Sequence, residues 1–278
     1  MLDLELDLAQ APLVFLDVET TGLEPGEGDR VCEIALLRYA HGQAQDALHQ
    51  LINPQRPVSP GAFRVHGLSD EMLRAAPPFA QVARDVLELV DEAVLVGHNT
   101  PFDLGFLAAE LARLGLRLPP LIALDTLRLA RRTYRLPSYS LGAVAQALGV
   151  TSAGQAHRAM QDVLMTHGVW ERLVMDLRPL GLRSIGDYLR AQGGELTFAQ
   201  PVPIEAPPAI QRALQENLLL RLRYLAESGQ ETERIVRPLA VMEYGGHATL
   251  VAHCLLRDAR RHFRLDRILE MELITDWR

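Results

Sequence analysis

The sequence predicts a mixed α/β sheet flanked by helices, followed by a second, small and mostly-β domain. Three strand-like segments come first without helices between them, which favours an antiparallel start to the sheet. Strand-like and helix-like segments then alternate, as in sheets covered by helices. After a stretch rich in Pro and Gly, apolar and polar residues alternate with period two, which indicates further strands.

The first part of the chain supplies five predicted strands. The early three are short apolar runs, and the third is stopped by Asn53-Pro54. Ser69 or Asp70 can cap a short helix, and apolar residues at helical spacing from Phe102 to Leu114 predict a longer one. The predicted strands cover 13–17, 31–39, 47–52, 93–96 and 121–124, and the predicted helices cover 79–89, 102–114, 126–134, 140–148 and 158–177.

The second part begins where Pro and Gly accumulate. We expect a linker at 179–207 that can hold one short helix near 184–191. Period-2 segments from Leu218 onwards, with turn signals at Gly229 and Gly245, predict a β domain over 208–278. The first domain is accordingly expected to cover 1–178.

Composition limits the classes of function. The net charge is −7 and all 28 basic residues are Arg, so a protein that coats nucleic acid through bulk positive charge is disfavoured. A catalytic lysine and a P-loop lysine are excluded. The two cysteines are far apart, which argues against a zinc site or a disulfide framework. An acidic N-terminus and the lack of a long apolar run favour a cytoplasmic protein without membrane contact.

Two carboxylates stand at the end of the first predicted strand. Asp17 and Glu19 are separated by one residue, so both side chains leave the same face of a strand. Neighbouring carboxylates repel and raise each other's pKa unless a cation lies between them. Oxygen ligands favour Mg²⁺ or Mn²⁺ over Zn²⁺. An acidic turn at a strand end without any function is the plain alternative.

Further acidic residues follow in the next motifs. Asp103 comes in a predicted first helical turn, where it could instead serve the helix dipole. His157 and Asp162 are five residues apart, which places them about 140° apart on an ideal helix. They cannot share one helix face, so we expect His157 on a loop before the helix and Asp162 inside it.

The three motifs together resemble the DEDDh (DnaQ-like) group of 3′–5′ exonucleases, which includes the proofreading epsilon subunit of bacterial DNA polymerase III. The resemblance covers about residues 11–177 and is supported by Glu33-Ile34-Ala35 and Val65-His66-Gly67-Leu68. It implies a ribonuclease H-like mixed sheet. It also implies that two divalent cations, Mg²⁺ or Mn²⁺, are held by four carboxylates, with a histidine as general base: Asp17, Glu19, Asp103, Asp162 and His157.

The same resemblance implies contacts with the terminal nucleotide. The residues that match those positions are Thr20, Thr21, Leu23, His66 and Phe102. Phe102 could instead belong to the helix core. A cluster of arginines at 128–135 could meet phosphates or form a solvated helix face.

The end of the chain resembles the WYL domain over about residues 208–275. The arginine-rich segment 260–268 supports this, although Thr249-Leu250-Val251 replaces the tripeptide that names the domain. The resemblance implies a face for an anionic ligand or single-stranded nucleic acid, formed by Arg237, Arg260 and Arg264. Exposed arginines paired with Glu231, Glu233 and Asp266 are the alternative.

The resemblance therefore implies an exonuclease that releases nucleoside 5′-monophosphates from the 3′ ends of DNA, preferentially of single-stranded DNA. We expect it to act in repair or proofreading, with polymerase or repair proteins as partners. One alternative is an exoribonuclease in RNA turnover. The other is a non-catalytic regulator that uses the nuclease-like fold for binding and the WYL-like module as a sensor.

Overall fold

The computed structural model describes residues 2–150, 157–198, 204, 206–244 and 246–275. The chain divides into two compact units. Residues 1–22, 30–111 and 117–199 form the first unit, and residues 23–29, 112–116 and 200–278 form the second.

The first unit is built on a five-stranded mixed sheet in the order β3-β2-β1-β4-β5. The strands β2 and β3 run antiparallel to their neighbours, whereas β4 and β5 are parallel to β1. The predicted mixed sheet is thereby confirmed. The strands are β1 (Leu13–Thr20), β2 (Val31–Ala40), β3 (Gln43–Leu51), β4 (Val94–Gly97) and β5 (Ile122–Asp125).

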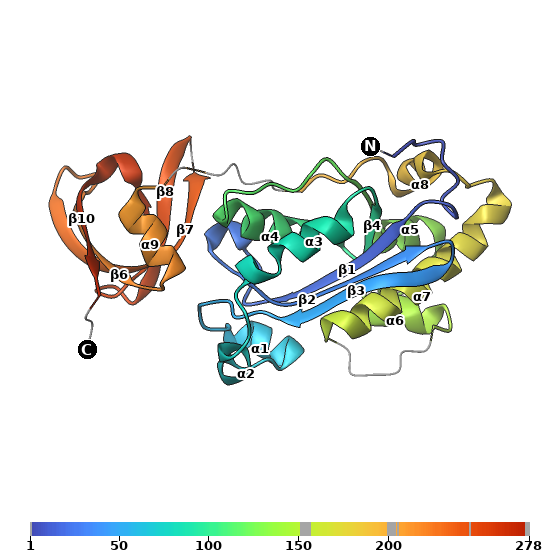
Figure 1. Cartoon of the computed structure of the whole chain (residues 1–278), viewed down its shortest axis with the longest axis horizontal. Helices are drawn as coiled ribbons and strands as arrows, with labels where there is room; N and C mark the ends of the chain where they lie inside the picture. Colours follow the sequence, from blue (N-terminus) through green and yellow to red (C-terminus); the bar gives the residue numbers. More distant parts are fainter. Residues whose placement is uncertain (1, 151–156, 199–203, 205, 245, 276–278) are drawn as a thin grey trace. The chain divides into compact units, whose positions relative to one another are not determined.

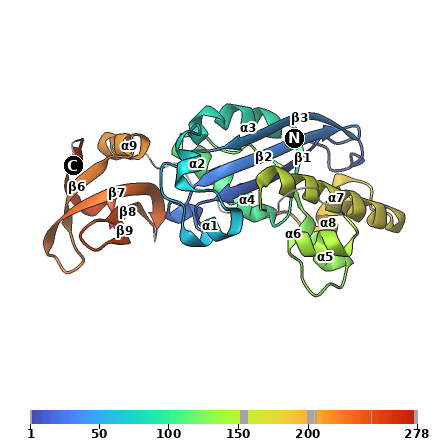
Figure 2. The same cartoon turned by 90° about the horizontal axis from the view of Figure 1, so that it is seen from below.

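Helices cover both faces of this sheet (Figures 1 and 2). Figure 2 shows β1 to β3 between α3 on one side and α7 on the other. In the part of the chain that the structure describes, no helix is both long and apolar enough to cross a bilayer. The α-helices are α1 (Pro60–His66), α2 (Asp70–Arg74), α3 (Ala83–Val90), α4 (Thr100–Arg113), α5 (Thr126–Thr133), α6 (Leu141–Ala147), α7 (Ala159–Leu177) and α8 (Ile185–Gln192). Short 3₁₀ turns lie at Pro25–Glu27, Phe79–Gln81 and Arg178–Leu180.

Strand alternation divides the core into two layers. Phe15 and its neighbours on alternate positions pack with Val163 and Leu173 of α7. Leu16 points the other way and packs with Phe106 of α4. Asp17 and Glu19 have the same parity as Phe15, so they face α7.

The segment expected to be a linker is partly packed against the first unit. Its predicted helix is α8, which Ser184 caps with a complete capping box. Ile185, Tyr188 and Leu189 of α8 are buried in the core cluster of the first unit. This apolar face, rather than the surrounding Pro and Gly residues, decides that the segment packs as part of the first unit.

The second unit is an antiparallel sheet in the order β10-β6-β7-β8-β9. Helix α9 (Pro208–Gln215) lies against this curved sheet and shares its core with Leu222, Leu250 and Phe263 (Figure 1). The predicted mostly-β domain is confirmed. The strands are β6 (Leu219–Leu225), β7 (Glu231–Tyr244), β8 (His247–Cys254), β9 (Ala259–Arg264) and β10 (Ile268–Ile274), with a 3₁₀ turn at Leu265–Arg267.

Candidate active site

The central strand β1 carries the first two carboxylates. Asp17 and Glu19 stand near its C-terminal end on the face that packs against α7. In the register with β2, Glu19 lies directly opposite Glu33. The C-terminal ends of β1, β4 and β5 meet at this edge of the sheet, which is where sheets of this kind place ligand sites.

Asp103 is held against the same strand from α4. This helix begins three residues after β4, so Asp103 falls in its first turn. The buried carboxylate accepts a hydrogen bond from the backbone N–H of Val18, with an N···Oδ1 distance of 3.0 Å. Asp103 is therefore fixed to the stretch of β1 that lies between Asp17 and Glu19.

The last two predicted residues come from the start of α7. Asp162 lies in the first turn of the helix, and His157 precedes it, as the helix geometry predicts. The side chains of Glu19, His157 and Asp162 each offer a ligand atom, and these atoms all lie within 4.8 Å of one another. Residues that are 138 and five positions apart in the sequence thus meet at one point.

Burial and mutual repulsion raise the pKa of all four carboxylic acids. Burial, followed by the charges of Asp103, Asp162 and Glu19, raises the pKa of Asp17 well above its ordinary value. Burial and the charge of Asp162 raise the pKa of Glu19 to about 8. The pKa values of Asp103 and Asp162 are also raised, chiefly by burial, although hydrogen bonds and His157 act against this.

This donor set fits divalent cations. Four carboxylates with raised pKa values are unfavourable neighbours, and a multivalent cation among them would relieve both desolvation and repulsion. Carboxylate oxygens are the ligands that hard cations prefer. The group formed by Glu19, His157 and Asp162 is the part of this set with the closest ligand atoms among the described residues.

The predicted nucleotide-binding residues next to Glu19 are tied into the local fold. The hydroxyl of Thr20 donates to the carbonyl of Gly22 at 2.6 Å, and the hydroxyl of Thr21 accepts from the N–H of Arg30 at 3.0 Å. His66, at the end of α1, accepts from the N–H of Leu68 through Nδ1 at 3.0 Å. Its Nε2 lies 3.2 Å from the carbonyl of Thr20 and can donate to it.

The other predicted contact residues differ in exposure. Leu23 is 75% exposed, as expected for a side chain that can wedge against bases. Phe102 is partly buried, and its ring lies 4.9 Å from that of Phe106. The nucleotide contacts of these residues remain a prediction.

The arginine cluster at the end of α5 is partly engaged. The guanidinium of Arg128 lies 3.9 Å from Asp125, and that of Arg131 lies over the ring of Tyr139. Arg131, Arg132 and Arg135 are exposed. Both interpretations of the cluster, phosphate contact and solvated face, therefore remain open.

In the second unit, two of the three predicted arginines share a row. Arg237 on β7, His253 on β8 and Arg260 on β9 are register partners. Nε of Arg237 is buried without a hydrogen-bond partner among the described residues.

Several arginines of this sheet are ion-paired, as the alternative expects. Arg264 pairs with Asp266 at 2.5 Å, and Arg260 pairs with Glu27 at 2.9 Å and with Asp29 at 3.5 Å. Arg221 pairs with Glu233, and Arg223 pairs with Glu231.

Sequence reasoning missed the role of a buried pair next to the site. Glu33 is fully buried and is bonded to the guanidinium of Arg158, next to His157. A charged residue inside the apolar run of β2 was the visible signal. Its partner stands 125 positions away, so no local pattern could identify it.

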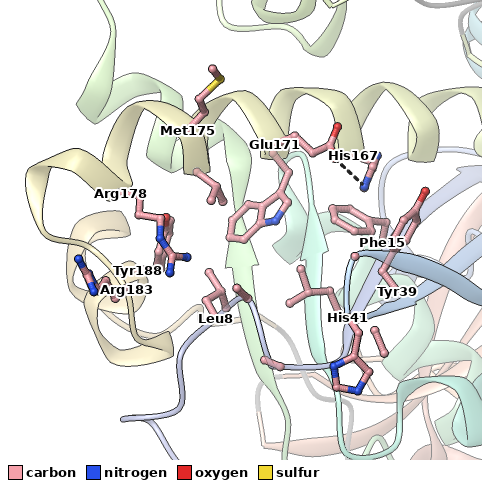
Figure 3. A pocket seen from close by; sticks show the side chains of 17 residues that line it. Leu8, Phe15, Tyr39, His41, His167, Glu171, Met175, Arg178, Arg183 and Tyr188 are labelled. Carbon is pink, nitrogen blue, oxygen red and sulfur yellow. Dashed lines mark ion pairs between the residues drawn. The ribbon is translucent and has the colours of Figure 1, made fainter.

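A cavity lies elsewhere in the first unit. It has a volume of about 350 Å³ and is lined by Phe15, Tyr39, Trp170 and Tyr188 among others. Figure 3 shows Arg178 and Arg183 at one end and the ion pair between His167 and Glu171 at the other. Its lining includes residues from the beginning of β1 and none of the predicted catalytic residues, so it is not the candidate active site.

Comparison with protein families divides the chain in the same order. Residues 14–169 match the family described as Exonuclease (RNase_T). Residues 205–273 match the WYL domain. The first match contains the whole carboxylate and histidine group.

Individual relatives agree with the first match. A DNA polymerase III subunit epsilon-like protein of Rhodobacter capsulatus is 36% identical over 66% of this chain, which spans 27% of that protein's length. The DNA polymerase III subunit epsilon of Rickettsia felis is 36% identical over 58% of this chain and 72% of its own length. Exonuclease I of E. coli, solved with a dA16 oligonucleotide, shares the fold with a TM-score of 0.55 at 20% identity. That likeness covers 87% of this chain and 55% of the exonuclease.

Proposed function

Because this chain belongs to the Exonuclease (RNase_T) family, we propose that it is a metal-dependent exonuclease that removes nucleotides from the 3′ end of DNA, preferentially of single strands. The convergence of Glu19, His157 and Asp162 within 4.8 Å carries this proposal. Names of the epsilon relatives support DNA as the substrate and polymerase or repair proteins as partners. We place the activity in proofreading or repair and in the cytoplasm.

The carboxylates would hold two divalent ions, Mg²⁺ or Mn²⁺. Asp17, Glu19 and Asp162 would bind one of them, and Asp17 with Asp103 would hold the second, partly through water. Bound in this way, the ions would supply charge that stabilises the attacking and leaving oxygens of the phosphodiester. The protein presents the carboxylate oxygens that would hold the ions from one strand, β1, and two helices, α4 and α7. Because these elements are already in place, little reorganisation is needed when substrate arrives.

His157 would act as the general base. Its imidazole lies beside Glu19 and Asp162, where the attacking water must be placed. An imidazole can accept a proton from water at a pH near neutral. The proton leaves the water as its oxygen bonds to phosphorus, and the 3′ oxygen of the preceding nucleotide departs. The product is a nucleoside 5′-monophosphate.

Degradation of labelled strands tests this proposal. We expect a 5′-labelled single-stranded DNA to be shortened stepwise from its 3′ end with Mg²⁺ or Mn²⁺, faster than an RNA of the same sequence. A block at the 3′ end should stop the reaction, whereas a block at the 5′ end should not. Faster loss of the RNA would favour the exoribonuclease, and shortening of neither strand would reject the enzyme.

For the whole chain we propose an exonuclease domain at 1–178, a connecting segment at 179–207 whose helix α8 packs on the core of the first unit, and a WYL-like domain at 208–278. The second domain would bind an anionic ligand or single-stranded nucleic acid through Arg237, Arg260 and Arg264. The unpartnered buried Nε of Arg237 supports this role. Arg264 is already paired with Asp266, and Arg260 with Glu27 and Asp29, so a ligand would have to compete with these carboxylates at both positions.

Salt titration of DNA binding tests the second domain. In a catalytically inactive background, the double substitution Arg237→Gln with Arg260→Gln should weaken binding to a long single strand. It should also reduce the slope of log K against log salt by about 1 to 1.5, as expected for two lost phosphate contacts. Arg223→Gln is the matched control: Arg223 lies on the same sheet and is ion-paired like Arg260, but it is outside the proposed ligand-binding set. If Arg223→Gln weakens DNA binding as much as the double substitution does, the result would contradict a specific site.

A further inference from the structure

We propose that Glu33 is a positioning residue for the general base: it holds the guanidinium of Arg158 and the backbone N–H of Ala159. These bonds fix the turn that aims His157 at the catalytic carboxylates. The inference rests on the proposed exonuclease function. It assigns a task to a side chain outside the group of predicted metal ligands.

The contacts of Glu33 are unusually complete. Its Oε1 accepts from Arg158 Nη2 at 2.9 Å and lies 2.8 Å from His49 Nε2. Its Oε2 accepts from Arg158 Nε at 3.1 Å and from the backbone N–H of Ala159 at 3.2 Å. The side chain of Glu33 is 0% exposed, so these bonds form in a low-dielectric environment where a planar fork of this kind is strong.

These bonds replace the missing cap of α7. Arg158 occupies the N-cap position but makes no side-chain cap hydrogen bond. The carboxylate of Glu33 instead binds the first N–H of the helix, where a negative charge also complements the helix dipole. The beginning of α7 is therefore attached to β2, the strand next to the one that carries Glu19.

His157 depends on this attachment more than Asp162 does. Its φ is 62°, in the left-handed region, and it stands outside the helix immediately before Arg158. Residues other than glycine seldom adopt this backbone conformation without support from their surroundings. Asp162, by contrast, belongs to a 19-residue helix whose Val163 and Val169 are buried in the core. A freed helix start would move His157 first.

Electrostatics are consistent with a fixed ion pair. Burial alone would raise the pKa of Glu33, but the hydrogen bonds from Arg158, His49 and Ala159 outweigh burial and lower the pKa. Glu33 therefore keeps its charge and its acceptors. On Glu19, which lies opposite Glu33, the two members of the pair act in opposite directions: the charge of Glu33 raises the pKa of Glu19, and that of Arg158 lowers it.

The substitution Glu33→Gln removes the charge and turns one acceptor into a donor that faces other donors. We expect kcat to fall by ~10- to 100-fold with KM within about 3-fold, because misplacement of a catalytic group by about 1 Å has effects of this size. The Mn²⁺ concentration for half-maximal activity should change by less than about 3-fold, since Asp162 is held by the packing of α7.

The matched control is Glu110→Gln. Glu110 is also buried in the first unit, and it also binds one arginine bidentately and one backbone N–H, those of Arg30 and Val31. With the folded fraction matched by circular dichroism, this variant should keep kcat within about 3-fold of the wild type. An equal loss in both variants would show only general destabilisation and would overturn the proposal.

A double-mutant cycle separates positioning from other effects. In a His157→Gln background, Glu33→Gln should cost less than about 2-fold in kcat, since the side chain that it positions is gone. A loss as large as in the wild-type background would overturn the proposal. If Glu33→Gln does not fold, Arg158→Lys replaces it in the cycle, because lysine keeps the charge and loses the fork. A wild-type protein that shortens no strand would reject the proposed function instead.

Discussion

Asp17→Asn is expected to lower kcat by at least ~10³-fold while raising the thermal stability of the metal-free protein. The amide has nearly the same shape, but it cannot replace the charged ligand that we propose two ions share. In the metal-free protein we expect the change to be favourable, since burial and four neighbouring carboxylates raise the pKa of Asp17 well above its ordinary value. Kinetics with Mn²⁺ and thermal unfolding in EDTA measure the two effects.

The pH dependence of this stabilisation has a definite sign. A carboxyl whose pKa is raised by folding contributes stability below its unfolded pKa and loses it as pH rises through the folded value. The melting temperature of Asp17→Asn should therefore exceed that of the wild type more at pH ~8 than at pH ~5. A relief of ~1 kcal/mol corresponds to about 2–4 °C.

The opposite pattern would argue against the assignment. Asp17 is a structural residue if Asp17→Asn melts at a lower temperature than the wild type in EDTA and loses activity only in proportion to the loss of folded protein. Glu110→Gln supplies the comparison, because it breaks a buried pair with Arg30 far along α4 from Asp103. That variant should lose stability and keep kcat per folded molecule.

Much of the fold follows from local patterns. Apolar runs locate β1, β4 and β5, and helical spacing locates α4 and α7. The strand and helix periods also predict that Asp17 and Glu19 share a face and that His157 must precede α7. These predictions need only the geometry of one element at a time.

What depends on contacts between distant segments could not be predicted in the same way. The bond between Asp103 and the N–H of Val18 spans 85 positions, and the pair of Glu33 with Arg158 spans 125. Pro and Gly near α8 suggested a linker, whereas three buried apolar side chains attach this helix to the core. Pro and Gly residues indicate where turns and loops lie. The packing of apolar side chains decides which unit a segment belongs to.

Divalent cations are expected to stabilise the protein strongly at alkaline pH and weakly at acidic pH. In the metal-free protein, burial and Asp162 raise the pKa of Glu19 to about 8. Its contribution to stability is therefore present below its unfolded pKa and is lost as pH rises toward and through 8. Mn²⁺ competes with the protons on these carboxylates, so it binds poorly where they are protonated and well where they are not.

Thermal unfolding with Mn²⁺ and with EDTA, at several pH values, measures this coupling. At a concentration of ~100 times its Kd, an ion that binds only the folded state contributes ~2.7 kcal/mol, which is a shift of several degrees. The shift should shrink toward pH ~5, and EDTA should abolish strand shortening at every pH. Glu19→Gln is the decisive comparison, because it removes one proposed metal ligand and the group whose pKa is raised to about 8. A Mn²⁺ shift that is unchanged in this variant, or that is equal at both ends of the pH range, would mean that the cation binds somewhere other than at the end of β1.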